Sequence, residues 1–255
     1  MINYLVRKTV RNFLKTYQKR VMSNIFTSTN IEVYGYCNRK CSFCFNSRLP
    51  ERKGGIMDVK LWEKIIDELS TIKYTGRISP YFYGEPLLDK RIVELISYAR
   101  RKCPYSRIHI SSNGDKLTEE LLIKLIENGL DKILITNYDD FEKEHITNLY
   151  MKYPRIIQYR NYKEIDLKNR AGSIFKKSTD MVNKPCLRPS RQLVINWNGN
   201  LLLCCNDYYE NYVFGNVKNE SILEIWESED FKKHREILSI AGGRKQFDIC
   251  SKCDM

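Results

Sequence analysis

Short β-like runs alternate with amphipathic helical runs over most of the first two thirds of the chain. The β-like runs lie at 31–36, 78–83, 107–111, 132–136 and 155–159, and the helical runs at 59–69, 89–101, 118–128 and 140–151. Strand followed by helix, several times over, predicts a mostly parallel sheet with helices laid over it. Such units close wholly or partly into a barrel, and functional groups gather at the carboxyl ends of its strands. We therefore expect an α/β fold with a partial (β/α) barrel.

The pattern changes from about residue 184. Two β-like runs, 193–197 and 201–204, flank an Asn198-Gly199 pair that favours a hairpin turn. A helical stretch at 221–240 follows. The sequence thus predicts three segments: a basic amphipathic helix within 1–28, the partial barrel over 29–183, and a small module of a β-hairpin plus a helix over 184–255.

Composition excludes several classes of protein. The chain has 255 residues, of which 42% are apolar and 29% charged, with only 12 glycines and 7 prolines. A collagen-like, low-complexity or wholly disordered chain is excluded, and the length suffices for a large domain with an appended module. No apolar run approaches the ~20 residues that cross a bilayer, and the N-terminus lacks the pattern of a secretory signal. We expect a cytoplasmic protein.

The N-terminal segment carries half of the net charge of +12. Six cations precede the first acid, Glu32: Arg7, Lys8, Arg11, Lys15, Lys19 and Arg20. Apolar residues recur at helical spacing with the basic residues opposite them: Val6, Val10, Phe13, Tyr17 and Val21. Two interpretations remain open: a helix packed on the domain with its basic side in solvent, or docking on an anionic membrane surface or an acidic partner.

Nine cysteines are many for a protein of a reducing compartment, and their number is odd. They fall in clusters separated by long gaps: Cys37, Cys41 and Cys44, then Cys103, Cys186, Cys204 and Cys205, and finally Cys250 and Cys253. A disulfide framework does not explain this distribution. Clustering of this kind points to metal binding.

The first cluster follows the first β-like run directly and has the spacing Cys37-x3-Cys41-x2-Cys44. Three thiolates on one loop can hold three irons of a [4Fe-4S] cube, because thiolate is the soft ligand that such clusters take. The fourth iron then lacks a protein ligand and can bind a small molecule, just as catalytic metals keep one position free. The alternative is a structural zinc loop that needs a distant fourth ligand.

On these residues the chain resembles the radical S-adenosylmethionine (SAM) superfamily, whose signature has this spacing and an aromatic residue in the place of Phe43. The resemblance implies that SAM binds the free iron. It also implies that an electron from the cluster splits SAM into methionine and a 5′-deoxyadenosyl radical, which removes a hydrogen atom from substrate. The hard chemistry then belongs to the cofactors, and the protein orients the substrate.

Two further motifs fall where the superfamily would have them. Gly84-Glu85-Pro86 closes the second β-like run, where the resemblance implies contacts to the amino end of SAM. Ser112-Asn113 ends the third run, where the resemblance implies contacts to the ribose and carboxylate of SAM. Taken alone, both motifs are ordinary turn signals.

The later cysteines can ligate a second cube completely. Four of them resemble the shortened SPASM module called the twitch domain, which holds one auxiliary [4Fe-4S] cluster: Cys186, Cys204, Cys250 and Cys253. A zinc ribbon is the alternative for this set alone. Cys205 competes with Cys204 for one ligand position, and the Gly-x4-Cys spacing selects Cys204. Cys103 is expected to be a buried structural thiol.

Within the superfamily, the length and cysteine layout resemble the radical SAM dehydrogenases of aminocyclitols. The resemblance implies abstraction of a carbinol hydrogen from a sugar or aminocyclitol-like molecule, deprotonation of the hydroxyl, and loss of one electron to leave a ketone. It also implies that Arg170 binds the substrate hydroxyl or assists its deprotonation, although an exposed linker arginine would look the same. Cys205 and Asn206, just past a cluster ligand, are candidates for the substrate pocket.

Other functions remain open. A radical SAM enzyme of this architecture can instead epimerise a carbohydrate or modify a peptide. A third class, a metal-stabilised nucleic-acid binder, would explain the pI of 9.2 and the 17 tyrosines but not an incomplete three-cysteine loop. We therefore expect no nucleic-acid partner. The excess positive charge points to an anionic or phosphorylated substrate, or to an acidic flavodoxin or ferredoxin as electron donor.

Overall fold

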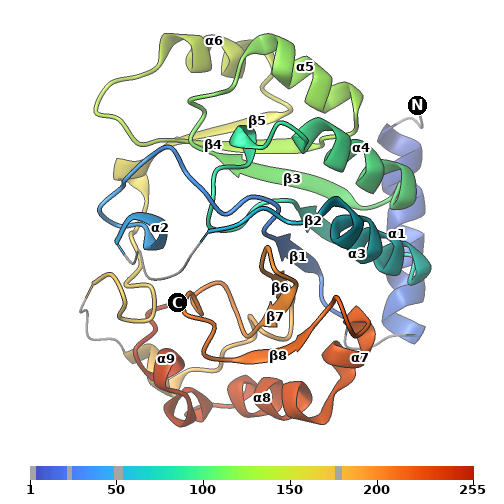
Figure 1. The fold of residues 1–255 in the computed structure, drawn as a ribbon, viewed down its shortest axis with the longest axis vertical. Helices are drawn as coiled ribbons and strands as arrows, with labels where there is room; N and C mark the ends of the chain where they lie inside the picture. Colours follow the sequence, from blue (N-terminus) through green and yellow to red (C-terminus); the bar gives the residue numbers. More distant parts are fainter. Residues whose placement is uncertain (1–3, 22–24, 49–53, 176–179) are drawn as a thin grey trace.

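The computed structural model describes residues 4–21, 25–48, 54–175 and 180–255. Its centre is an eight-stranded sheet with helices around its outer side (Figure 1). The lower part of the sheet in this view, β6 to β8, belongs to the C-terminal module. The strands are β1 (Ser28–Ile31), β2 (Arg77–Ser79), β3 (Arg107–Ser112), β4 (Lys132–Asn137), β5 (Ile157–Asn161), β6 (Gln192–Ile195), β7 (Asn200–Leu202) and β8 (Val213–Asn216). The sheet remains open, which confirms a partial barrel.

The strand order is β5-β4-β3-β2-β1-β6-β7-β8. Neighbours from β5 to β6 are parallel, so their carboxyl ends meet at one edge of the sheet. Each connection among the first five strands crosses over through a helix, as parallel pairing requires. The strand–helix alternation in the sequence therefore predicted the topology of this half correctly.

Helices cover the outer face of the sheet (Figure 1). The principal ones are α3 (Val59–Thr71), α4 (Ile92–Lys102), α5 (Glu119–Glu127) and α6 (Glu144–Lys152). Side-chain caps fix two of their starts: Asp58 accepts from the Lys60 amide before α3, and Thr118 accepts from the Leu121 amide before α5. Alternate strand residues such as Ile108 and Ile133 are fully buried against these helices.

The first strand begins three residues earlier than the sequence pattern indicates. Ser28–Ile31 pairs with β2 on one side and β6 on the other, whereas the following segment makes only an isolated bridge between Tyr34 and Ile56. The Gly35 amide donates to the Gly55 carbonyl at 2.8 Å, so this segment already turns toward the cysteine loop. The apolar pattern of 31–36 therefore indicated burial, and it did not indicate which residues pair in the strand.

The C-terminal module is continuous with the barrel sheet. Its first strand, β6, lies parallel to β1, and β6 and β7 form the expected hairpin, with Gly199 at a φ of 91°. Of the predicted helical stretch at 221–240, the structure makes two helices, α7 (Ile222–Glu227) and α8 (Glu229–Ser239). Ser228 separates them because its backbone is extended there and its hydroxyl accepts from the Phe231 amide, starting a new helix.

The N-terminal helix α1 (Tyr4–Val21) lies beside α3 and α4 at the end of the sheet where the strands begin (Figure 1). One interpretation of the sequence was a packed helix with its basic side in solvent, but the helix is oriented the other way round. Arg11 is buried and donates to the Tyr105 carbonyl at 2.6 Å, and Arg7 pairs with Asp131 at 3.5 Å, while Phe13 is 72% exposed. The carbonyls and the acid before β3 and β4 attract the guanidinium groups, so part of the basic side faces the protein.

Within the described ranges, no helix has both the length and the apolar character needed to cross a membrane.

Candidate active site

The three-cysteine loop leaves the carboxyl end of β1 and enters the short helix α2 (Phe45–Arg48). Cys37, Cys41 and Cys44 are half-buried, and the Cys44 amide donates to the Cys41 carbonyl at 3.1 Å just before α2. Burial, and then the nearby Cys44 and Cys37, raise the pKa of Cys41 to about 11. The three thiols therefore lie close enough to repel one another when ionised, and cluster iron would relieve that repulsion.

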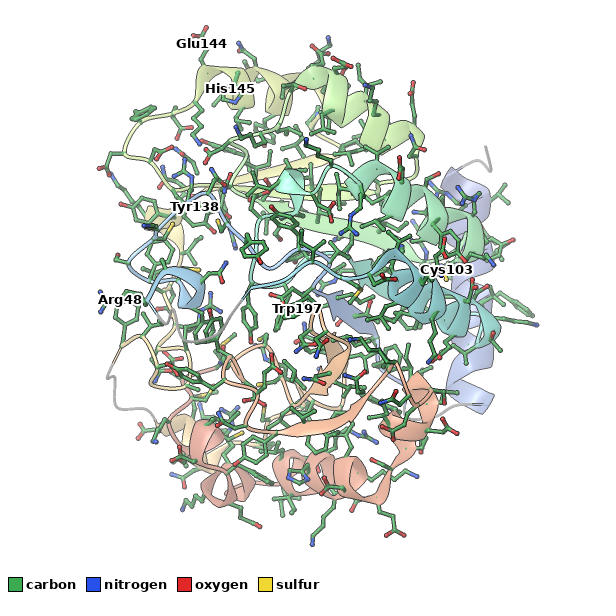
Figure 2. All side chains as sticks on the ribbon, viewed as in Figure 1. Arg48, Cys103, Tyr138, Glu144, His145 and Trp197 are labelled. Carbon is green, nitrogen blue, oxygen red and sulfur yellow. The ribbon has the colours of Figure 1, made fainter. Side chains whose placement is uncertain are left out.

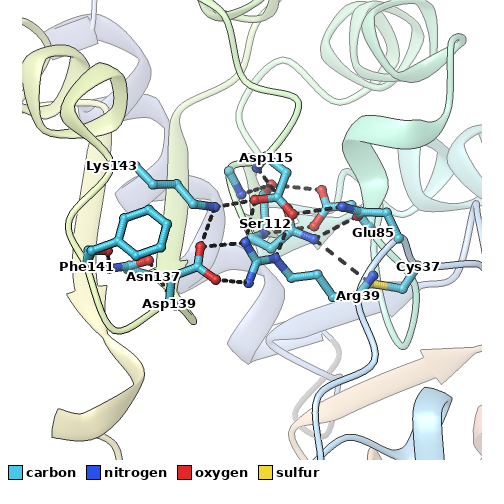
Figure 3. A network of polar contacts seen from close by, with 12 residues as sticks. Cys37, Arg39, Glu85, Ser112, Asp115, Asn137, Asp139, Phe141 and Lys143 are labelled. Carbon is cyan, nitrogen blue, oxygen red and sulfur yellow. Dashed lines mark hydrogen bonds and ion pairs between the residues drawn. The ribbon is translucent and has the colours of Figure 1, made fainter.

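Arg39, inside this loop, is the centre of a polar network (Figure 3). Its guanidinium donates to both oxygens of Asp115 at 2.6 Å and to the oxygens of Asp139 at 2.8 and 2.7 Å. Lys143 pairs with the same two carboxylates, and Asn38 donates to Asp115 at 2.7 Å. Because Asp115 follows β3 and Asp139 follows β4, the network ties the cysteine loop to the ends of two strands.

Both carboxylates of this network are held in the ionised form. Burial opposes ionisation of Asp115, but hydrogen bonds from Arg39 and Lys143 outweigh it and put the pKa well below its usual range. Hydrogen bonding from Arg39 is the main cause that lowers the pKa of Asp139 to about 2. The two cations neutralise the two carboxylates. The network therefore restrains the loop while adding little net charge beside the cysteines. Sequence reasoning missed it; the position of Arg39 between two cysteines was the available signal.

The two predicted SAM-binding motifs lie side by side and bond to each other. The Glu85 carboxylate is buried and accepts from the Ser112 hydroxyl and the Asn113 amide, both at 2.8 Å, and from the Leu87 amide at 3.0 Å. Burial raises the pKa of Glu85 although these donors oppose the shift. The side chains of Glu85 and Ser112 thus join the ends of β2 and β3, while Asn113 points its amide toward Cys37, 3.9 Å from the sulfur.

The local structure explains why glycine occupies position 84 and proline position 86. A Cβ at Gly84 would lie 2.1 Å from the Tyr34 carbonyl oxygen, so no larger residue fits this approach of the loop to the β1 extension. Pro86 opens a short 3₁₀ helix, Pro86–Leu88, which Glu85 caps. Phe43 stacks on Tyr162 with ring centroids 5.9 Å apart. Binding of SAM by this set stays a prediction.

The other four cysteines line one cavity in the C-terminal module. Its described lining is Cys186, Arg188, Pro189, Cys204, Asn206, Arg244, Ile249, Cys250, Cys253 and Met255. The Asn206 side chain donates to the Cys253 sulfur at 3.3 Å, and its backbone amide to the Cys204 sulfur at 3.4 Å. Asn206 therefore faces this cavity. Burial is the main cause that raises the pKa of Cys250 to about 12.

Both cysteine sets fit iron clusters. Thiolate is the soft ligand that such clusters take. The second set places four cysteines around one cavity, enough for one thiolate on each iron of a cube.

The two remaining cysteines differ. Cys205 places its sulfur 3.3 Å from an Arg188 nitrogen, and its carbonyl 3.4 Å from the Tyr83 hydroxyl. Cys103 is 3% exposed among α3, α4 and the sheet, on the opposite side of the molecule from Tyr138 (Figure 2). Burial raises the pKa of Cys103 to about 12, as expected for a structural thiol.

Arg170 lies between the two cysteine sites. Its guanidinium sits over the ring of Phe45, 5.5 Å from the centroid, and Phe45 immediately follows Cys44. The preceding residue, Asn169, bonds to the auxiliary module: its side chain donates to the Lys252 carbonyl at 2.6 Å and its amide to Asp254 at 2.9 Å. Arg170 and the next residue both have a φ of 55°, a strained conformation that the surrounding contacts hold.

An aromatic group beside Arg170 also escaped sequence reasoning. The rings of Phe45 and Tyr208 stack with centroids 4.8 Å apart, and Tyr83 packs edge-on against both. The three side chains come from the cysteine loop, the end of β2 and the auxiliary module. They give the space between the two sites an apolar wall.

An open parallel barrel with three thiols after its first strand, joined to a module with four more, defines an iron–sulfur enzyme class. The chain belongs to the radical SAM superfamily: the profile of that superfamily matches residues 31–164, and that of the SPASM iron-sulfur cluster-binding domain matches residues 186–254. This confirms the resemblance found in the sequence, and with it SAM and [4Fe-4S] clusters as the cofactors.

Similar proteins are known over nearly the whole chain. The SAM-dependent 2-deoxy-scyllo-inosamine dehydrogenase of Niallia circulans is 32% identical, over 91% of this chain and 94% of that protein. The crystal structure of BtrN with AdoMet and 2-DOIA matches with a TM-score of 0.83 at 31% identity, covering 91% of this chain and 94% of that one. An open conformation of BtrN matches with a TM-score of 0.73.

Proposed function

We propose that the protein is a radical SAM dehydrogenase that oxidises a secondary alcohol of a sugar or aminocyclitol-like molecule to a ketone. The position of Arg170 carries the proposal: it lies over the residue next to Cys44, on a loop that Asn169 fastens to the auxiliary module. A substrate held there would lie between the two cluster sites. The similarity to an aminocyclitol dehydrogenase over 94% of that protein supports the same chemistry.

The residues divide the work as follows. Cys37, Cys41 and Cys44 would hold the cluster that supplies the electron for SAM cleavage, and four thiols would hold the second cluster: Cys186, Cys204, Cys250 and Cys253. The aromatic wall would form an apolar side of the substrate space. Arg170 would bind the reacting hydroxyl, and its positive charge would favour loss of the hydroxyl proton to water. The contacts of Asn169 would hold the strained Arg170 backbone, and with it this group, in place before substrate binds.

Analysis of the product tests the proposal. The anaerobically reconstituted enzyme is given SAM, a reductant and an aminocyclitol in heavy water. We expect a ketone two electrons more oxidised than the substrate, together with 5′-deoxyadenosine. An inverted carbon carrying solvent hydrogen would instead identify an epimerase, and a modified peptide substrate would identify the peptide branch.

Cysteine variants separate the two sites. Cys37→Ala should abolish release of 5′-deoxyadenosine, because the remaining thiols cannot hold the SAM-binding cluster. Cys250→Ala should reduce ketone formation more than SAM cleavage. Cys103→Ala is the matched control, and it should leave both products unchanged. Equal and complete loss of SAM cleavage in the first two variants would contradict separate roles for the clusters.

We further propose an anionic or phosphorylated substrate. Arg160, Arg170 and Arg188 come from strands or loops at the site end of the sheet, and none has a carboxylate partner in the described part of the chain. Cations that no carboxylate neutralises favour negative charge nearby. A phosphorylated aminocyclitol should therefore stimulate SAM cleavage at a lower concentration than the free form. An equal or better response to the free form would contradict this.

We propose that an acidic flavodoxin or ferredoxin supplies the electron. Lys40 within the cysteine loop and Arg48 at the end of α2 are both exposed, and Arg48 lies at the molecular edge (Figure 2). Opposite charges accelerate such encounters, and salt screens them. Reduction by flavodoxin should slow with added salt and in Lys40→Glu. Dithionite reduction of the same variant serves as the control.

We also propose contact of α1 with an anionic membrane surface. Phe13 is 72% and Val6 is 51% exposed, and Lys8 is exposed beside them. An apolar side chain flanked by cations suits the interface of anionic lipids. Sedimentation with phosphatidylserine vesicles should pull down the protein and much less of Phe13→Ser. Equal sedimentation of both, or none with either, would contradict the proposal.

A further inference from the structure

The auxiliary cysteine cavity is lined by cations and by no acid. Arg188 and Arg244 line it together with the thiols, and among the described lining residues there is no Asp or Glu. The only other polar side chain in that lining, Asn206, donates to the Cys253 sulfur. Apart from the thiols, the polar side chains of this lining are Arg188, Asn206 and Arg244, and all three can donate hydrogen bonds to negatively charged sulfur.

Arg188 lies among the thiols of this cavity. Its guanidinium donates to the Cys205 sulfur at 3.3 Å, and the residue lines the cavity together with Cys186 and Cys204. Its positive charge thus lies near two of the four expected cluster ligands.

Arg244 lines the same cavity and bonds to the backbone on both sides of it. It is 3% exposed, and it donates to the Pro185 carbonyl at 3.3 Å and to the Cys253 carbonyl at 3.5 Å. Its Nε is buried without a hydrogen-bond partner in the structure.

We propose that Arg188 and Arg244 raise the reduction potential of the auxiliary cluster, so that this cluster can receive the electron of substrate oxidation. A cluster with four thiolates gains one negative charge on reduction, and fixed cations in a partly buried site stabilise that charge. The proposal rests on the dehydrogenase function. There, the substrate radical that has lost its hydroxyl proton to water gives up one electron and becomes the ketone, and the oxidised auxiliary cluster is reduced by that electron.

Redox titration followed by electron paramagnetic resonance tests the proposal without substrate. The full-length chain with Cys37, Cys41 and Cys44 replaced by Ala carries only the auxiliary cluster. In this background we expect Arg188→Gln to lower the one-electron equilibrium constant for reduction about tenfold, which corresponds to ~59 mV. Arg188→Lys, which keeps the charge, should restore most of the potential. Lys233→Gln removes an exposed cation of α8 in the same module, and it should change nothing.

The outcomes are separable. An unchanged potential in Arg188→Gln and Arg244→Gln, both with full iron content, would overturn the proposal. If Arg188→Gln binds no iron, Arg244→Gln gives the measurement; failure of both to bind iron would assign them a structural role and overturn it as well. In the otherwise unaltered enzyme, Arg188→Gln should lower the ketone formed per 5′-deoxyadenosine. A shifted potential without any ketone from the parent enzyme would disprove the dehydrogenase function and leave the tuning role intact.

Discussion

Single charged residues decide how the cysteine loop is held. Arg39 makes four hydrogen bonds to Asp115 and Asp139 from within the loop that carries Cys37 and Cys41. A flexible loop would have to be ordered each time a cluster is built, at a cost in conformational entropy. The network provides that order in advance.

Replacing Arg39 should loosen this loop. In Arg39→Gln both carboxylates keep Lys143 but lose the cation that joins them to the loop, so we expect at least a severalfold loss of iron retained at the first site. Iron content and 5′-deoxyadenosine release measure it. Lys124→Gln removes a cation of an exposed helix pair and is the control. Full iron retention in Arg39→Gln would argue against the positioning role.

The network also predicts a pH dependence. The folded-state pKa values of Asp115 and Asp139 lie below their unfolded values, so their contribution to stability is fully present above about pH 4 and is lost as pH falls toward 2. Asp139→Asn should therefore be less stable than the parent at pH 7. The difference should shrink below pH 4 in urea unfolding. A difference that persists at pH 2 would contradict the ion pairs.

His109 on β3 should also lower stability as pH falls, but over a higher and milder pH range. Burial, and then the charge of Arg77, lower its pKa to about 4. Between about pH 6.5 and 4 the unfolded chain binds a proton that the folded chain does not, so stability falls as pH falls. His109→Gln should remove on the order of 2 kcal/mol of this loss, as measured by urea unfolding at pH 7 and pH 4.5. His145 on α6 provides the control substitution.

At the scale of elements, local caps place helix boundaries that hydrophobic periodicity does not reveal. Apolar residues repeat at helical spacing through 221–240, yet Ser228 ends α7 and begins α8. The capping hydroxyl satisfies an amide that would otherwise lack a partner. The break allows Trp226 and Phe231 to pack edge-on with centroids 5.3 Å apart, and Arg235 lies over the Trp226 ring.

Ser228→Ala should lower the free energy of unfolding by about 1 kcal/mol, because the Phe231 amide loses its acceptor. Chemical denaturation of the anaerobic protein measures the change. Ser239→Ala, at the exposed end of α8, should change it far less. Equal values for the two variants would show that the cap contributes little.

At the scale of the whole molecule, the barrel and the auxiliary module share one sheet. β1 pairs with β2 and with β6, and Trp226 of the module packs on Phe26 at 5.0 Å, just before β1. The first barrel strand thus has a neighbour from each part. The predicted division near residue 184 therefore separates two segments that pack against each other in one sheet.

The two parts should consequently unfold together. Trp62 is buried between α3 and α4, and Trp226 lies in the module. Tryptophan fluorescence of Trp62→Phe and of Trp226→Phe should give the same midpoint as far-UV circular dichroism of the same variant. Two separated transitions would show independent domains.

The sequence alone determined what depends on neighbours along the chain. Cys37, Cys41 and Cys44 lie on one loop whatever the fold does, so their spacing alone predicts a cluster site. Hydrophobic periodicity predicted the parallel strands. Tertiary structure decided the contacts across long separations. Arg39 meets Asp115 and Asp139 from 76 and 100 positions away, and Ser28 pairs with Gln192 across the sheet. Burial and charge compensation in the folded protein determine such partners. Local sequence patterns do not contain this information, because the partners are far apart along the chain.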